Sequence, residues 1–202
     1  MTLIGNCTEC STRACVSGGP FPEGCPSISE PATVGEGIRQ TASDLFARKM
    51  MSSASVIQRN EDGSVRNRLE ETVALCKEMG FSRVGLAFCV ALAKEARVVS
   101  KALLDAGLDV IPVCCKVGRV GLSDLGVETP CARKGSSCNP ITQAAIMNAH
   151  DTDLNILLGL CIGHDILFAK SSSSPLTTLV VKDRALNHNP AAGLREPDLP
   201  IS

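Results

Sequence analysis

The sequence predicts an α/β fold: a Rossmann-like three-layer domain with a parallel sheet of about four strands. Two observations support this prediction. Short apolar runs alternate with helical patterns over residues 83–181. The runs are apolar on both faces, which is typical of strands in a parallel sheet that helices cover on each side. A chain of 202 residues is long enough for one such domain (31–202) and a small cysteine-rich segment (1–30).

Two helices are predicted before the sheet, because apolar residues recur at helical spacing over residues 38–54 and from Ser64 to Gly80. The alternating part follows in this order: strand 83–88, helix 90–106, strand 109–114, a loop over 116–137, helix 139–150, strand 154–160, helix 164–170 and strand 176–181. Right-handed crossovers place the carboxyl ends of all the strands at one edge of the sheet. The serine run at 171–174 is expected to form a tight loop at that edge.

Composition argues against several classes of partner. The net charge is −1, and the chain has five Phe but no Trp or Tyr, so neither nucleic acid nor an anionic membrane is an expected partner. The apolar runs are far shorter than a membrane span. The amino terminus lacks the pattern of a signal peptide. Eleven cysteines, an odd number, then favour metal ligation or thiol chemistry in a reducing cytoplasm over disulfides.

Four cysteines lie close together in the first 30 residues: Cys7, Cys10, Cys15 and Cys25. Few aliphatic residues separate them, so a bound metal is expected to replace the missing hydrophobic core. Four thiolates suit tetrahedral zinc or a cubane iron–sulfur cluster. The spacing matches neither the bacterial ferredoxin pattern nor a zinc ribbon, so the identity of this metal stays open.

A second set of cysteines follows the predicted strands or begins a helix: Cys89, Cys115, Cys138 and Cys161. Cys114 precedes Cys115 directly, and neighbouring side chains of a strand point to opposite faces, so we expect Cys115 to line the cleft and Cys114 to be buried. Ligands drawn from four separate loops favour an iron–sulfur cluster, since structural zinc sites usually use close pairs. Ordinary buried packing of each cysteine is the alternative.

Four polar side chains accompany this second set. His164 is a candidate proton donor or ligand, or a helix cap. Lys182 and Arg184 are candidates for binding an anionic substrate, assisted by Lys116, although a solvated ion pair with Asp183 is the simpler interpretation of the first two.

Cys76 lies on an apolar helical stripe and is expected to pack in the core. Cys131, in the long loop seven residues before Cys138, is a candidate ligand, a reactive thiol or a residue without a role, and these alternatives stay open.

The chain resembles the metal-binding family catalogued as domain of unknown function 1847. The resemblance rests on the following segments: GLAFC at 85–89, CCKVG at 114–118, CNPITQA at 138–144, NILLGLCIGHD at 155–165, KDRALNHNP at 182–190, and the amino-terminal cysteines with Pro26. It implies a cytoplasmic metal-binding protein, found mostly in anaerobic prokaryotes, without a settled activity. Arg195 departs from the family pattern, which has an aromatic end.

These observations predict an iron–sulfur redox protein or enzyme with two clusters, of the 4Fe-4S type. One cluster would lie in the amino-terminal cysteine segment, and its partner would be an electron-transfer protein. The other would lie in the α/β cleft and act on a small anionic substrate, as an oxidoreductase or a lyase. Two alternatives stay open: a zinc-binding structural or interaction module, and a thiol-based sulfur carrier that uses Cys115 or Cys161.

Overall fold

The computed structural model of the chain describes residues 7–128 and 135–194. The chain divides between Val56 and Ile57 into two compact units. The first unit contains α1 (Ala14–Ser17), α2 (Pro26–Ser29), α3 (Pro31–Ser43) and α4 (Leu45–Val56). Helices α3 and α4 therefore belong with the cysteine segment, whereas the sequence prediction placed the start of the α/β domain at residue 31.

The single helix predicted over 38–54 is in fact two helices. Asp44 separates them, and its side-chain oxygen accepts hydrogen bonds from the backbone N–H groups of Phe46 and Ala47 at 2.8 and 3.2 Å. An aspartate at this position satisfies the free N–H groups at the start of a helix. The helical apolar pattern alone did not reveal this break.

Helix α5 (Arg68–Met79) begins the second unit's regular structure, and it starts later than predicted. Asn67, rather than Ser64, is the capping residue: its side chain accepts from the N–H groups of Leu69 and Glu70, and Glu70 accepts from the N–H of Asn67 in return. This is a capping box. Ser64 instead lies in a turn that an antiparallel bridge between Arg59 and Val65 closes.

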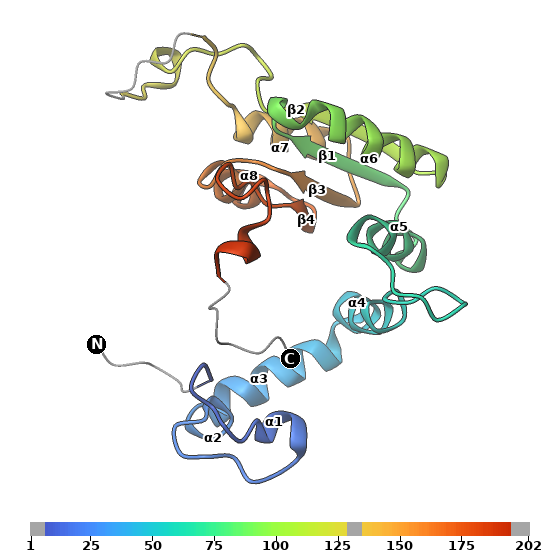
Figure 1. The fold of residues 1–202 in the computed structure, drawn as a ribbon, viewed down its shortest axis with the longest axis vertical. Helices are drawn as coiled ribbons and strands as arrows, with labels where there is room; N and C mark the ends of the chain where they lie inside the picture. Colours follow the sequence, from blue (N-terminus) through green and yellow to red (C-terminus); the bar gives the residue numbers. More distant parts are fainter. Residues whose placement is uncertain (1–6, 129–134, 195–202) are drawn as a thin grey trace. The chain divides into compact units, whose positions relative to one another are not determined.

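The sheet confirms the predicted fold class. Its strands are β1 (Arg83–Phe88), β2 (Asp109–Cys114), β3 (Leu154–Leu158) and β4 (Leu176–Val180), all parallel and in the order β2-β1-β3-β4 (Figure 1). The connecting helices are α6 (Ala93–Asp105), α7 (Pro140–Ala149) and α8 (His164–Ser171). Three short 3-10 turns accompany them: Val90–Leu92, Ser123–Leu125 and Pro190–Gly193.

Two hydrophobic cores, one on each face of the sheet, make the domain three-layered. One core joins α5 and α6 to the sheet through residues such as Cys76 and Leu103. The other joins α7 and α8 to the sheet through Met147 and Phe168. The strand order reverses between β1 and β3, and in such sheets ligands bind at this switch point, outside the carboxyl ends of the strands.

The serine run is at the opposite edge from the one that we predicted. It joins α8 to β4, so it lies where β3 and β4 begin. Ser172 accepts a hydrogen bond from the buried Asn155 amide at 2.8 Å, and Thr152 donates to the other end of that amide at 2.9 Å. Ser172 therefore satisfies a buried polar group at the amino edge of the sheet, and the serine run is not part of the site at the carboxyl edge.

The described helices include none that is long and apolar enough to cross a membrane.

Candidate functional site

A pocket of about 400 Å³ lies at the carboxyl edge of the sheet. Its walls contain all four cysteines predicted from the strand ends and all four polar residues predicted to accompany them. The lining residues are Cys89, Val90, Ala91, Cys115, Lys116, Leu122, Gly135, Ser136, Ser137, Cys138, Cys161, His164, Lys182 and Arg184. The structure thus brings the predicted residues together, and their roles as ligands remain a prediction.

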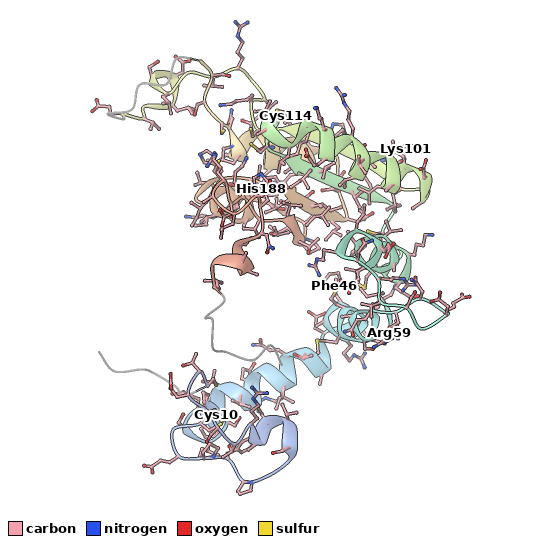
Figure 2. All side chains as sticks on the ribbon, viewed as in Figure 1. Cys10, Phe46, Arg59, Lys101, Cys114 and His188 are labelled. Carbon is pink, nitrogen blue, oxygen red and sulfur yellow. The ribbon has the colours of Figure 1, made fainter. Side chains whose placement is uncertain are left out.

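Two of the thiols form the buried floor of this pocket. Cys89 and Cys115 follow β1 and β2 directly, and their backbone N–H groups continue the sheet by bonding to the carbonyls of Leu158 and Phe88 at 3.1 and 2.9 Å. The two cysteines are 6% and 2% exposed. Cys114, labelled at the end of β2 in Figure 2, is not among the residues that line the pocket. It is only partly buried and packs against the same core as Cys115. The prediction that Cys115 lines the cleft is therefore confirmed, but the prediction of a buried Cys114 on the opposite face is wrong, because regular strand alternation does not continue past the last residue of β2.

Cys138 reaches the same floor from the start of α7. Its sulfur lies 3.7 Å from that of Cys115. The next residue, Asn139, ties this helix to the strand end, because its N–H bonds to the Cys115 carbonyl at 2.8 Å and its side chain caps the helix. The strand end and the helix start are therefore held together, and with them their two thiols.

Cys161 enters from the turn between β3 and α8. Gly159 leaves the strand with a φ of +63°, and a Cβ at this position would lie 2.0 Å from Leu92, so only glycine fits. The Cys161 carbonyl then accepts from the N–H groups of His164 and Asp165 at 2.8 and 3.1 Å. Together the glycine and this tight turn aim Cys161 at the pocket.

Hydrogen-bond donors reach three of the four sulfur atoms. Lys182 donates to Cys89 at 2.8 Å, Arg184 donates to Cys161 at 3.1 Å, and the backbone N–H of Val90 donates to Cys115 at 3.4 Å. We predicted Lys182 and Arg184 as contacts for a substrate anion, and in this structure they contact sulfur. Such donors stabilise thiolates and tune the potentials of thiolate-bound metals.

These contacts shift the pKa values of the floor thiols in opposite directions. Burial tends to raise the pKa of Cys89, but the hydrogen bond and charge of Lys182 outweigh it and lower the pKa overall. Burial raises the pKa of Cys115 to about 12, and the neighbouring Cys138 and Cys89 thiols add to this shift. Without a metal, Cys115 is therefore a protonated thiol at neutral pH, whereas a metal ion would displace its proton.

His164 is the first residue of α8, and its ring lines the pocket. The backbone N–H of His164 bonds to the Cys161 carbonyl in the preceding turn. No side-chain hydrogen bond caps the start of α8, so the imidazole is not used as a helix cap. Burial lowers the pKa of His164, and the positive charges of Lys116 and Arg184 lower it further. A neutral imidazole at physiological pH can accept a proton or bind a metal.

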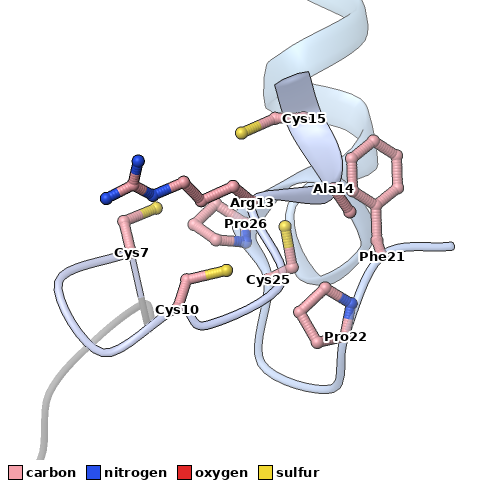
Figure 3. A pocket seen from close by; sticks show the side chains of 9 residues that line it. All are labelled: Cys7, Cys10, Arg13, Ala14, Cys15, Phe21, Pro22, Cys25 and Pro26. Atoms are coloured by element: carbon pink, nitrogen blue, oxygen red, sulfur yellow. The ribbon is translucent and has the colours of Figure 1, made fainter. Parts of the chain in front are cut away.

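The amino-terminal cysteines line a separate, smaller pocket of about 90 Å³ in the first unit. Figure 3 shows the sulfur atoms of Cys7, Cys10, Cys15 and Cys25 pointing toward one shared space. Phe21 and two prolines form its apolar side. The volume is well below the roughly 300 Å³ at which pockets for organic ligands begin, so an inorganic group is the better fit.

The thiol sets do not form a finished site for a single ion. Within residues 7–128 and 135–194, no group of three or more His, Cys, Asp or Glu side chains is arranged to hold one metal ion. The donor chemistry nevertheless fits a soft metal, because each pocket presents four cysteines and one or more cations. Cys131 lies outside the described residues.

Sequence reasoning missed part of the pocket wall. The backbone around Val90 and Ala91, and residues 135–137 of the long loop, line the cleft beside the cysteines. Lys116 holds this loop by donating to the Ser136 carbonyl at 2.6 Å. The glycine-rich composition of a loop that follows a strand end was the signal that could have indicated this.

Comparison with known proteins places the chain in a family. The model of the DUF1847 family, described as a protein of unknown function, matches residues 25–179. The chain belongs to the DUF1847 family. The resemblance seen in the sequence is thereby confirmed. The DUF1847 match includes Cys25 and the four cleft cysteines, and it ends before Lys182 and Arg184.

One curated relative is similar to much of the chain. The chain is 46% identical over 132 residues to the uncharacterized protein MJ0455 of Methanocaldococcus jannaschii, and the aligned part makes up 64% of this chain and 67% of the relative. The printed name of the relative assigns no activity to it.

Cys76 is a buried cysteine that belongs to neither pocket. It is fully buried in the core between α5 and the sheet, as its helical position predicted. Burial raises its pKa to about 11. We expect iodoacetamide to leave Cys76 unmodified in the native protein and to modify it after denaturation, because the reactive thiolate is both rare and inaccessible. Peptide mass spectrometry measures this, and modification at native-state rates equal to those of Cys161 would contradict the placement.

Proposed function

We propose that this DUF1847 protein is a metal-binding protein whose α/β cleft holds a thiolate-bound centre, an iron–sulfur cluster of the 4Fe-4S type. Cys89, Cys115, Cys138 and Cys161 are the proposed ligands. A second centre is proposed for the amino-terminal pocket, where it would exchange electrons with a protein partner. The observation that carries the proposal is that four thiols, from the three connections that follow β1, β2 and β3, line one pocket, with hydrogen-bond donors on three of them.

The charges of the cleft support this proposal. Four thiolates carry four negative charges. The inorganic part of a 4Fe-4S cluster with a charge of +2 would balance two of them and leave two unbalanced. Lys182 and Arg184 supply two positive charges directly at the sulfur atoms. Partly buried charges are stable only when they are paired, and this arrangement pairs them.

A cluster fits the pocket better than a single ion does. The pocket of about 400 Å³ is much larger than an ion, and the described side chains do not converge on one point. The remaining space, next to Lys116 and His164, suits a small anionic molecule. When bound, a cluster supplies electron transfer or Lewis-acid chemistry, while Lys116 would attract the anion and His164 would move a proton.

Zinc is the second candidate, because of one distance. Tetrahedral zinc with its sulfur ligands at about 2.3 Å places those sulfurs about 3.8 Å apart. The Cys115 and Cys138 sulfurs lie 3.7 Å apart. A sulfur carrier is a third candidate, and among its two nucleophiles the contact with Arg184 favours Cys161 over the protonated Cys115.

Elemental analysis separates these candidates. The full chain is purified without oxygen from cells supplied with both iron and zinc, and iron, zinc and acid-labile sulfide are measured per chain. We expect iron and sulfide in equal amounts and a brown protein, whose colour is easy to detect because Trp and Tyr are absent. A colourless protein with stoichiometric zinc would favour the second candidate, and a metal-free protein the third.

A further inference from the structure

We infer that Cys161 is the exchangeable ligand of the cleft: three thiols hold the metal centre, and Cys161 yields its position to a small thiolate. This inference rests on the proposed function and adds a ligand class to it. It follows from differences among the four cysteines in their contacts and surroundings.

Three of the thiols form a connected group. The sulfurs of Cys115 and Cys138 are 3.7 Å apart. Cys89 and Cys115 follow directly after Phe88 and Cys114, which are paired in the neighbouring strands β1 and β2. Backbone hydrogen bonds from the ends of β1, β2 and α7 hold all three in place. A group held this rigidly at the pocket floor is suited to permanent ligation.

Cys161 lies at the rim and has a different partner. Cys161 is partly exposed, as Cys138 is, but the residue that follows Cys161, Ile162, is 88% exposed. Its sulfur accepts a hydrogen bond from Arg184 at 3.1 Å. A Cβ at Gly163, in the same turn, would meet no atom within 4 Å, so this turn is open on that side. Arg184 is placed to hold the thiolate charge whether or not Cys161 binds the metal.

The pocket has both the space and the charge to accept a replacement. Its volume of about 400 Å³ falls within the range of small-molecule sites. Lys116 contacts a backbone carbonyl and not a sulfur, so its charge is available to an incoming anion. The metal position that Cys161 would vacate prefers soft donors such as sulfur, so a thiolate should bind there more tightly than a carboxylate. The chemistry therefore points to a small thiolate.

The test compares Cys161→Ala with Cys138→Ala in the full chain, each purified without oxygen and checked for folding by circular dichroism. We expect Cys161→Ala to keep the iron and sulfide content of the wild type, and Cys138→Ala to lose the cleft share. Cys161→Ser, which is closer in size, serves as the second variant if the alanine variant is unfolded. Equal losses of iron from the Cys161 and Cys138 variants would overturn the inference while leaving the proposed function standing. Wild-type metal content in both variants, and in Cys115→Ala, would instead mean that the cleft holds no centre.

A second measurement tests the ligand class. We expect 2-mercaptoethanol to change the electron paramagnetic resonance spectrum of reduced Cys161→Ala protein at lower concentration than it does for the wild type, because the vacated position is open to it. Acetate at the same concentration is the matched carboxylate probe and should have a smaller effect. A spectrum that neither probe changes, or that acetate changes more, would contradict the assignment of a small thiolate.

Discussion

Replacing Cys115 with alanine is expected to remove the metal of the cleft and to leave the fold in place. Cys115 lies at the centre of the thiol group: it contacts Cys138, accepts from the Val90 N–H, and follows the strand end paired with that of Cys89. Alanine removes the ligand but keeps the backbone bonds that join β1, β2 and α7. Metal per chain, measured against the wild type, should fall by the whole cleft share, while the circular dichroism spectrum is unchanged.

Cys76→Ala is the matched control for this experiment. Cys76 is as buried as Cys115, but it packs among apolar side chains on the other face of the sheet. Its truncation should cost about 1 kcal/mol of stability through the small cavity that it leaves, with no loss of metal. A Cys115→Ala protein with full metal content, or a Cys76→Ala protein that loses the same share, would show that the cleft thiols are packing residues.

Replacing Gly85 with alanine is expected to have the largest effect on stability. Gly85 lies in the middle of β1, and a Cβ there would be 2.1 Å from Oδ1 of Asn155 and 2.5 Å from Sδ of Met147. Asn155 cannot move away easily, because Thr152 and Ser172 hold both ends of its buried amide. We expect a loss of about 3 kcal/mol from overpacking, and a fall in Tm of roughly 6–12 °C for a chain of this size.

Gly37→Ala provides the comparison for Gly85→Ala. Gly37 lies within α3, and a Cβ at this position meets no atom within 4 Å. Alanine is the better helix former, so this change should be neutral or slightly stabilising. Thermal unfolding of the two variants, followed by circular dichroism, measures the difference. If Gly85→Ala were as stable as the wild type, the close packing of β1 against Asn155 and Met147 would be wrong.

The sequence predicted the sheet well because its signals were local and repeated. The alternation of apolar runs with helical patterns depends on backbone geometry alone. The helix boundaries were less predictable. Asn67 and Asp44 begin their helices by accepting hydrogen bonds from backbone N–H groups, and other Ser, Asn and Asp residues nearby could do the same. The serine run was misplaced because we grouped it with the strand ends. A loop that leads from a helix into a strand lies at the amino end of that strand, so this run lies at the other edge of the sheet.

The site was predictable in its membership but not in its contacts. Cys89, Cys115, Cys138 and Cys161 meet because strand ends and a helix start share one edge of a parallel sheet. That Lys182 contacts Cys89 and Arg184 contacts Cys161 depends on how long side chains cross the pocket, and spacing along the chain contains no such information. The same limit applies to the wall formed by residues 135–137, which reaches the cleft through a long loop.

X-ray absorption at the iron edge of the full chain tests the proposed cleft centre most directly, when Cys115→Ala is measured beside the wild type. We predict sulfur neighbours and iron–iron scattering in the wild type, with a loss in the variant of the share of iron that belongs to the cleft. Iron surrounded by oxygen or nitrogen alone, or an unchanged iron content and spectrum in Cys115→Ala, would contradict a thiolate-bound cluster in this pocket.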